Sequence, residues 1–258
     1  MPILLTKENE RCTMERVFPV SIAETDCTHC VKPVVILNYM QDLAYYSIEK
    51  YDKKFGCNGL AQMGLAWFII RYHIEFENNP IDVKQLKVLT ESRGVKRLNA
   101  YRDFEVYDNL TGNKILSAAS SWFIVDTESK SVINAQKIFP DLNLYQEREG
   151  DLELAKLKSP ERIDYEKTFH VRYDDIDVNN HVNNTVYITW ALEALDYDFR
   201  KSNKIKSLDI YFKHDVSYGE DVISQAKYNP EDNTTEHVIK KLSNNEELCI
   251  LKIGFVQI

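Results

Sequence analysis

Hydrophobic and polar positions follow the same succession of patterns in two parts of the chain. Apolar residues alternate with polar ones over residues 18–22 and again over 169–173. This period of two is typical of a β-strand with one buried face. An acidic, polar loop follows each strand, and a long apolar stretch then occupies residues 33–51 and 184–200. The length of these stretches predicts a helix in each part.

The two predicted helices are apolar on nearly all sides. A helix without a broad polar face must be buried on several sides. A curved antiparallel sheet wrapped around each helix would bury it in this way. Pro33 suits the first turn of the first helix. Either Asn183 or Asn184 can cap the second helix.

Four further segments after each helix have the composition of β-strands. They cover residues 66–77, 84–93, 99–107 and 115–125 in the first part, and 207–213, 221–228, 236–242 and 247–257 in the second. Turn residues join the last two strands of each part, DNLTGN at 108–113 and SNNEE at 243–247. A strand, a long helix and then a four-strand antiparallel run is the element order of a hotdog fold.

The two parts are copies of one another. Phe18 and Asp26 match Phe169 and Asp177, and both pairs are separated by 151 positions. A repeat at a constant offset indicates a duplicated structural unit. We therefore expect an α+β protein of two tandem hotdog domains, each a curved antiparallel sheet wrapped around a long central helix. The predicted boundaries are 1–139 for the first domain, 140–160 for a charged linker and 161–258 for the second domain.

Composition and charge narrow the classes of function. The 258 residues are 44% hydrophobic and 28% charged, which is ordinary for a globular protein. A net charge of −8 argues against a nucleic-acid binder, which needs a basic face. The five scattered cysteines do not form the pattern of a disulfide framework. No apolar run approaches the roughly 20 residues of a membrane span, and the first residues lack a signal-peptide pattern, so we expect a cytoplasmic protein.

The loop before the second helix carries the residues with the clearest chemistry. Asp177, Asn179 and His181 alternate along it, and in an extended segment this spacing would point their side chains to one side. Histidine titrates near neutrality and can act as a general base or acid. The loop also precedes a helix N-terminus, whose free N–H groups favour an oxyanion. These features are suited to acid–base catalysis in which an oxyanion develops.

The same loop resembles the acyl-ACP thioesterases of plants and bacteria. Their second half carries the pattern D-x-N-x-H-x-N-N-x-x-Y, which stands here as Asp177, Asn179, His181, Asn183, Asn184 and Tyr187. The stretch WFIIRYHIEFENNPIDVKQLKVLTE at 67–91 is similar to the family's tryptophan–arginine strand, and AASSWFIVD at 118–126 to another of its strands. The resemblance covers nearly the whole chain.

The resemblance implies hydrolysis of fatty acyl-ACP to free fatty acid and acyl carrier protein. It implies Asp177, Asn179, His181 and Asp215 as catalytic residues, with Asp215 in a position where many members have glutamate. It implies no metal and no cofactor besides the 4'-phosphopantetheine that the substrate carries. Some plant members have a cysteine beside that carboxylate, but this chain has none there, which favours activation of water by His181.

The resemblance also places the acyl chain in the first half. Tyr39, Met40 and Leu43 of the first helix are the candidates for lining that pocket. The basic residues Arg93, Lys96 and Arg97 are candidates for docking the acidic carrier protein or the phosphopantetheine phosphate. A plain core helix and a solvated basic loop are the structural alternatives for these two groups.

Several alternatives stay open from the sequence. An acyl-CoA thioesterase would use the same chemistry, and a non-catalytic acyl-binding protein could have the same fold. The run from Cys27 to Cys30 could suggest a metal or redox site, but it lacks a second ligand pair. Because Cys30 occupies the position of His181, we interpret the first loop as a degenerate copy of the site. The preferred acyl length and the formation of a homodimer are not determined by the sequence.

Overall fold

A computed structural model describes residues 13–51, 54–140 and 142–257. Cys12, the first of the five cysteines, lies outside these residues. The chain divides into two compact units, the first comprising Met1–Arg71 and Pro80–Leu154, and the second comprising Tyr72–Asn79 and Ala155–Ile258.

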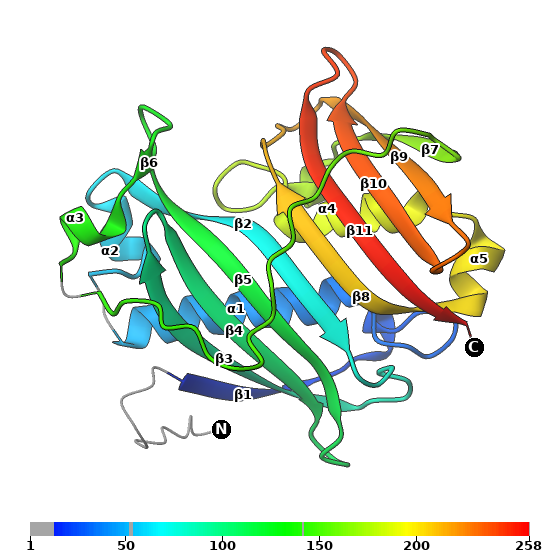
Figure 1. Cartoon of the computed structure of the whole chain (residues 1–258), viewed down its shortest axis with the longest axis horizontal. Helices are drawn as coiled ribbons and strands as arrows, with labels where there is room; N and C mark the ends of the chain where they lie inside the picture. The colour runs from blue at the N-terminus through cyan, green and yellow to red at the C-terminus, as the bar shows by residue number, and fades with distance from the viewer. Residues whose placement is uncertain (1–12, 52–53, 141, 258) are drawn as a thin grey trace. The chain divides into compact units, whose positions relative to one another are not determined.

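The first unit is an antiparallel sheet with a long helix packed against it (Figure 1). Strands β1 (Thr13–Pro19), β3 (Gln85–Lys96), β4 (Asn99–Asp108) and β5 (Lys114–Asp126) pair in this order. Strand β2 (Leu65–Phe76) follows β5 in the strand order, and its residues from Tyr72 onward are assigned to the second unit. The short β6 (Val132–Ile133) pairs with the end of β5. Helix α1 (Pro33–Tyr51) packs on β1 and β3 and has the predicted bounds.

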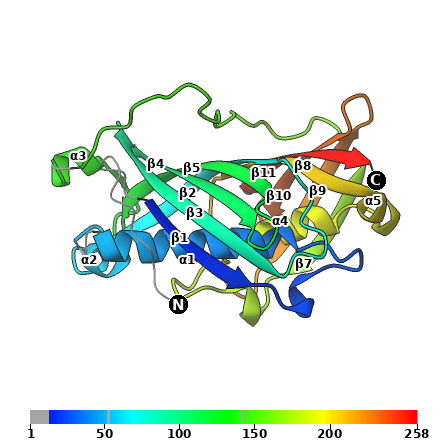
Figure 2. The same ribbon diagram turned by 90° about the horizontal axis from the view of Figure 1, so that it is seen from below.

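The core of the first unit lies between α1 and the sheet. Ile36, Leu37 and Met40 of the helix are fully buried, and so are Val88 and Leu116 of the strands. Figure 2 shows α1 against one face of these strands. This helix lacks a broad polar face because it is buried against the sheet, as we expected from the sequence.

Two short helices in the first unit were not predicted. They are α2 (Cys57–Ala61) and α3 (Ala135–Ile138). Leu60 of α2 is fully buried in one hydrophobic cluster with Phe139 and Ile124. Helices this short have too few residues to show a hydrophobic period, so the sequence pattern does not predict them.

Residues 142–154, here called the strap, lie on the face of the first sheet opposite α1 (Figure 2). The Val95 N–H donates to the Asn143 carbonyl at 2.8 Å, and the Tyr145 N–H donates to the Val95 carbonyl at 2.9 Å. Gly94 has a φ of 89°, and a Cβ there would lie 2.5 Å from the Asn143 oxygen. Only glycine permits so close an approach. The first part of the expected linker is thus bound to the first unit.

The second unit repeats the plan of the first. Strands β8 (Asn203–Phe212), β11 (Glu247–Gln257), β10 (Thr234–Lys241), β9 (Asp221–Asn229) and β7 (Tyr165–His170) follow one another in an antiparallel sheet. Helix α4 (Asn184–Glu193) packs on β9 and β10 (Figure 1).

The structure corrects two predicted boundaries. The expected helix over 184–200 ends at Glu193, and a separate helix α5 (Tyr197–Ser202) follows. Asp196 has an extended backbone and starts the new helix, while the intervening turn keeps Leu195 buried. The opening strands also end early, because Ile22 and Tyr173 lie in short 3₁₀ turns and are exposed.

Candidate functional site

The loop between β7 and α4 is a tight turn. An antiparallel bridge joins Ile176 to Val182 at its base. Inside it, the Asp177 N–H donates to the His181 carbonyl at 2.8 Å, and Asn180 has a φ of 63°. The expectation that alternate residues would project to one side of an extended loop is therefore wrong. The left-handed residue turns the chain back on itself, which ends the period of two.

The carboxylate of Asp177 holds this turn together. Its Oδ1 accepts the Asn179 N–H at 2.8 Å and the His181 N–H at 3.4 Å, and its Oδ2 accepts the Asn179 side-chain amide at 3.2 Å. An ionised carboxylate makes such bonds stronger than a neutral acceptor would. Asp177 and Asn179 are therefore bonded to each other and to the loop backbone.

His181 lies beside Asp215. Its Nε2 is 2.9 Å from Oδ2 of Asp215, and the two side chains are 26% and 53% exposed. Asp215 comes from the segment between β8 and β9, and the Val182 N–H donates to the neighbouring Val216 carbonyl at 3.2 Å. This backbone bond aligns the two segments. The pair is accessible to solvent, as a site that activates water requires.

Helix α4 begins directly after the turn. The Asn183 side chain accepts the Thr185 N–H at 2.9 Å. Asn183 is therefore the N-cap residue, whereas the sequence allowed either Asn183 or Asn184. The buried Asp175 accepts the Arg172 N–H at 2.9 Å and contacts its guanidinium. The positive end of the helix dipole thus lies next to His181, where it would stabilise a developing oxyanion.

The first unit contains the same turn with different side chains. Asp26 accepts the Thr28 N–H at 2.8 Å, the Thr28 hydroxyl at 2.6 Å and the Cys30 N–H at 3.1 Å. His29 has a φ of 61°, like Asn180 in the second turn. Cys30 replaces His181 and is buried. The turn is the same in the two units, whereas a histidine at the position of His181 is present only in the second.

The neighbour of the turn also differs between the units. The Val31 N–H donates to the Pro80 carbonyl at 2.9 Å, just as Val182 bonds Val216. The residue before Pro80 is Asn79, so no carboxylate occupies the position of Asp215. The first loop accordingly has neither member of the His–Asp pair.

The residues expected to line an acyl pocket lie along α1. Met40 and Leu43 are 0% and 1% exposed. The Tyr39 hydroxyl donates to Glu24 at 2.7 Å and the ring stacks on Phe18, with centroids 4.3 Å apart. Met40 and Leu43 belong to the core beneath the sheet, and their contact with an acyl chain stays a prediction.

The structure removes Arg93 from the expected docking cluster. Its side chain is only 3% exposed and forms ion pairs with Asp103 and Asp151. It also donates to the Gln146 carbonyl of the strap at 3.1 Å. Arg93 is therefore a buried anchor, because its charge is neutralised by two carboxylates. Lys96 and Arg97 remain exposed at the turn between β3 and β4, with Lys96 2.6 Å from Glu147.

Of the cysteines in the described part of the chain, Cys27 and Cys57 are exposed, and Cys30 and Cys249 are buried. Cys249 on β11 is fully buried, and burial raises the pKa of its thiol well above the usual value. A buried thiol of this kind is a poor nucleophile. Among the described residues, no cluster of histidine, cysteine and acidic side chains has the arrangement of a metal site. No helix in that part of the chain is long and apolar enough to cross a membrane.

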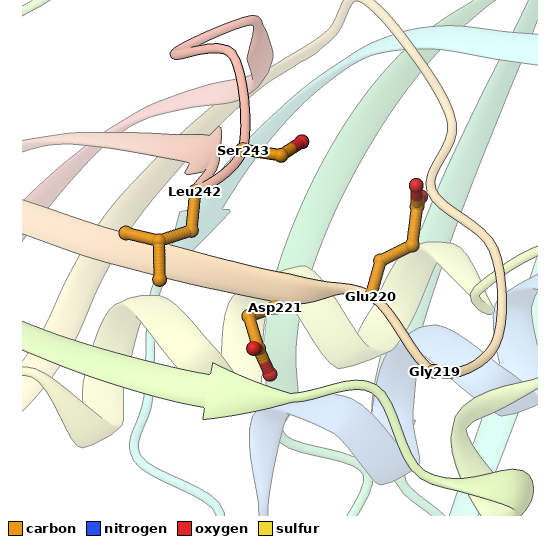
Figure 3. Close-up of a pocket in the computed structure, with 5 residues that line it drawn as sticks. All are labelled: Gly219, Glu220, Asp221, Leu242 and Ser243. Carbon is orange, nitrogen blue, oxygen red and sulfur yellow. The ribbon is translucent and has the colours of Figure 1, made fainter.

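A shallow pocket of about 310 Å³ lies at the end of the segment that carries Asp215 (Figure 3). It is lined by Gly219, Glu220, Asp221, Leu242 and Ser243. Both of its carboxylates have basic partners, since Glu220 pairs with Lys241 and Asp221 lies 2.8 Å from His170. The residues that line the pocket include neither His181 nor Asp215.

Two compact units, each with antiparallel strands and a helix packed on them, and a His–Asp pair beside the N-terminus of α4 define the chain as an α+β protein with a candidate acid–base site. Residues 11–142 match the family model of the acyl-ACP thioesterase N-terminal domain, and residues 158–256 match that of its C-terminal domain. The chain belongs to the acyl-ACP thioesterase family.

Individual relatives support this assignment. The chain is 25% identical over 228 residues to oleoyl-acyl carrier protein thioesterase 2, chloroplastic, of Arabidopsis thaliana, covering 81% of this chain and 60% of that protein. It spans about 46% to 60% of the length of this and two further curated plant relatives.

Solved structures share the fold. An acyl-ACP thioesterase from Bacteroides thetaiotaomicron has a TM-score of 0.81 at 22% identity, covering 95% of this chain and 98% of that one. The 12:0-ACP thioesterase from Umbellularia californica has a TM-score of 0.82 at 17% identity, with coverage of 96% and 98%.

Proposed function

We propose that this protein hydrolyses the thioester of fatty acyl-ACP, releasing a free fatty acid and the carrier protein with its phosphopantetheine thiol. The observation that carries the proposal is the contact of 2.9 Å between His181 Nε2 and Asp215. The match of both halves to family domains supports it, and so does the name of the Arabidopsis relative, an oleoyl-acyl carrier protein thioesterase.

In this proposal His181 is the general base, and Asp215 orients its ring and stabilises the imidazolium. His181 removes a proton from a water molecule as the water oxygen bonds to the thioester carbonyl carbon. The carbonyl oxygen becomes an oxyanion near the N-terminus of α4. The carbon–sulfur bond then breaks, the leaving thiolate takes the proton from His181, and the fatty acid is released.

The proposal extends to the fold and the substrate. Each unit is a hotdog domain, so that the chain is a tandem of two, with catalysis in the second and the acyl chain held along α1 of the first by Met40 and Leu43. The duplicated turn supports this division, since only the second copy keeps the histidine. Lys96 and Arg97 are the basic residues proposed to meet the acidic carrier protein. A cytoplasmic location is part of the same proposal.

An acyl-CoA thioesterase is the second candidate, because the His–Asp pair attacks the same thioester group in both substrates. The two candidates differ in what the basic residues contact. Reversal of charge at Lys96 and Arg97 should raise KM for acyl-ACP and leave KM for acyl-CoA nearly unchanged.

The test is the release of free fatty acid from a panel of acyl-ACPs and acyl-CoAs with chains of different length. We expect hydrolysis of acyl-ACP by the purified protein. His181→Ala should lower kcat by roughly 10²–10⁴-fold, the usual contribution of a positioned base. Cys30→Ala is the matched control in the first turn and should leave kcat close to that of the wild type. Equal loss in both variants, or no release from any acyl-ACP, would contradict the proposal.

A further inference from the structure

Two exposed tyrosines lie on the two segments that carry His181 and Asp215. Tyr173 precedes the turn that presents His181, and Tyr218 comes three residues after Asp215. The ring centroids of Tyr173 and Tyr218 are 6.5 Å apart, and their planes are inclined by 81°, which is an edge contact. Tyr173 is 81% exposed and Tyr218 is 63% exposed. Because three residues of extended chain span at most about 11 Å, these rings, here called the tyrosine pair, lie close to the candidate site.

The fold does not need the tyrosine pair to join these two segments. Two backbone hydrogen bonds already join them, and the first unit has the same two bonds between its matching segments. The donor and acceptor residues are Val171 and Glu220, and Val182 and Val216, in the second unit, and Val20 and Lys84, and Val31 and Pro80, in the first. Tyr173 matches Ile22 at the constant offset of the repeat, and Tyr218 matches Asp82, which lies midway between the two acceptors. The first unit therefore joins its segments without a ring pair.

Exposed rings in contact with each other are suited to binding a ligand. Single exposed apolar residues, such as Ile22 at 91%, are common on proteins and need no explanation. Contiguous exposed apolar surface beside a site instead marks a place of interaction. Tyrosine combines an apolar ring with a hydroxyl that donates and accepts hydrogen bonds. The tyrosine pair thus fits a molecule that has both apolar carbon and amide groups.

One arm of the proposed substrate has this chemistry. A fatty acyl chain is apolar along its length and is stabilised by removal from water, which rings this exposed do not provide. The pantetheine arm, on the other side of the thioester, has two amide groups and a carbon that carries two methyl groups. Its amides can bond the tyrosine hydroxyls while its methyl groups contact the rings.

We propose that Tyr173 and Tyr218 bind the pantetheine arm of the substrate beside the His181–Asp215 pair. This inference rests on the proposed function and deepens it, because it names the part of the substrate that this surface contacts. Binding energy from an arm that does not react holds the thioester at His181. The ring pair is present in the unit that has the His–Asp pair, and the matching residues of the first unit, Ile22 and Asp82, have no rings.

The kinetic test compares two thioesters of the same fatty acid, one with pantetheine and one with N-acetylcysteamine, which lacks the second amide and the dimethyl carbon. The Tyr173→Ala/Tyr218→Ala double variant should raise KM about fivefold or more for acyl-pantetheine and change it less than about twofold for acyl-N-acetylcysteamine, since it removes binding and not chemistry. Ile22→Ala is the matched control, because it truncates the exposed residue at the position of Tyr173 in the first unit. It should keep both KM values. Equal KM changes for the two thioesters would overturn the proposal.

The source of the arm is tested in the same way. Acyl-ACP and acyl-CoA both carry pantetheine, so the double variant should raise KM for both. A rise for acyl-CoA alone would place its nucleotide on the rings, and a rise for acyl-ACP alone would place the surface of the carrier protein there. Either of these results would overturn the proposal.

Binding of an alkyl pantetheine thioether tests the site without hydrolysis, because a thioether has no carbonyl to be attacked. In an NMR titration of the wild type, this probe should shift the ring signals of Tyr173 and Tyr218. Its Kd should be about fivefold or more higher for the double variant, as for truncation of tyrosines that carry binding energy. An unchanged Kd would refute the site even if the wild type hydrolyses acyl-ACP. Weaker binding by the double variant, with a wild type inactive on every acyl-ACP, would instead refute the proposed function alone.

Discussion

At the scale of single residues, comparison of the two turns distinguishes the structural role of an aspartate from a chemical one. Asp26 and Asp177 make matching sets of hydrogen bonds within their turns. Only the second turn has a histidine at the position of His181, which lies 2.9 Å from Asp215; the first has Cys30 there. Asp26 is present in a turn that has Cys30 at the position of His181, so its hydrogen bonds serve the turn itself. We therefore infer that Asp177 acts by shaping the loop that presents His181.

Replacing either aspartate by alanine should test this inference. Each change removes charge-assisted hydrogen bonds, so Asp177→Ala and Asp26→Ala should both lower the free energy of unfolding by about 1.5–3 kcal/mol. Asp177→Ala should in addition lower kcat by about 10²-fold, since the histidine loses its place. Denaturation curves and acyl-ACP kinetics measure both effects. A large loss of kcat in Asp26→Ala would show that the two turns are not separate in function.

At the scale of elements, the strap is part of the first unit because Arg93 binds it. The guanidinium bonds Asp151 at 2.8 and 3.0 Å. Burial raises the pKa of Asp151, but the hydrogen bonds from Arg93, the Arg148 N–H and Tyr145 outweigh it and lower the pKa to about 2. Asp151 thus stays ionised at neutral pH. This charged, poorly hydrophobic segment is held by a buried cation in addition to its backbone hydrogen bonds with Val95.

Arg93→Met should release the strap. It leaves Asp103 and Asp151 without their cation, and breaking a buried pair in this way costs about 3–5 kcal/mol. We expect proteases to cut within residues 142–154 at lower concentration than in the wild type. Lys96→Met is the control, because its ion pair with Glu147 is exposed and worth at most about 1 kcal/mol. Similar protease patterns for the two variants would mean that Arg93 does not anchor the strap.

At the scale of the whole molecule, the stability of the protein in acid should depend on one buried histidine. His237 is 0% exposed, its Nε2 lies 2.7 Å from the Thr235 hydroxyl, and burial lowers its pKa to about 3. In the unfolded chain a histidine has a pKa of about 6.5. Below that pH the unfolded state binds a proton that the folded state does not, so stability falls as the pH is lowered from about 6.5 towards 3.

His237→Leu should therefore flatten the acid side of the stability curve. The wild type should lose on the order of a few kcal/mol more than the variant between these two pH values. Urea denaturation at a series of pH values measures the difference, whatever the stability of the variant at neutral pH. Parallel curves for the two proteins would show that His237 does not control the acid response.

The sequence by itself determined the features that depend on neighbouring residues. The constant offset between the copies, the bounds of α1 at Pro33 and Tyr51 and most strand positions follow from local patterns of apolar residues. The short helices and the break after Glu193 do not, since a single turn has too few positions to show a period.

Only the tertiary structure decided how distant residues meet. From the sequence, Arg93 was expected to be an exposed basic residue, but in the fold it is buried between Asp103 and Asp151. The alternation of Asp177 and His181 predicted that their side chains lie on one face. The left-handed residue Asn180 between them turns the chain instead. The physical reason is that burial and hydrogen-bond partners are properties of the folded path of the chain, which local sequence patterns do not contain.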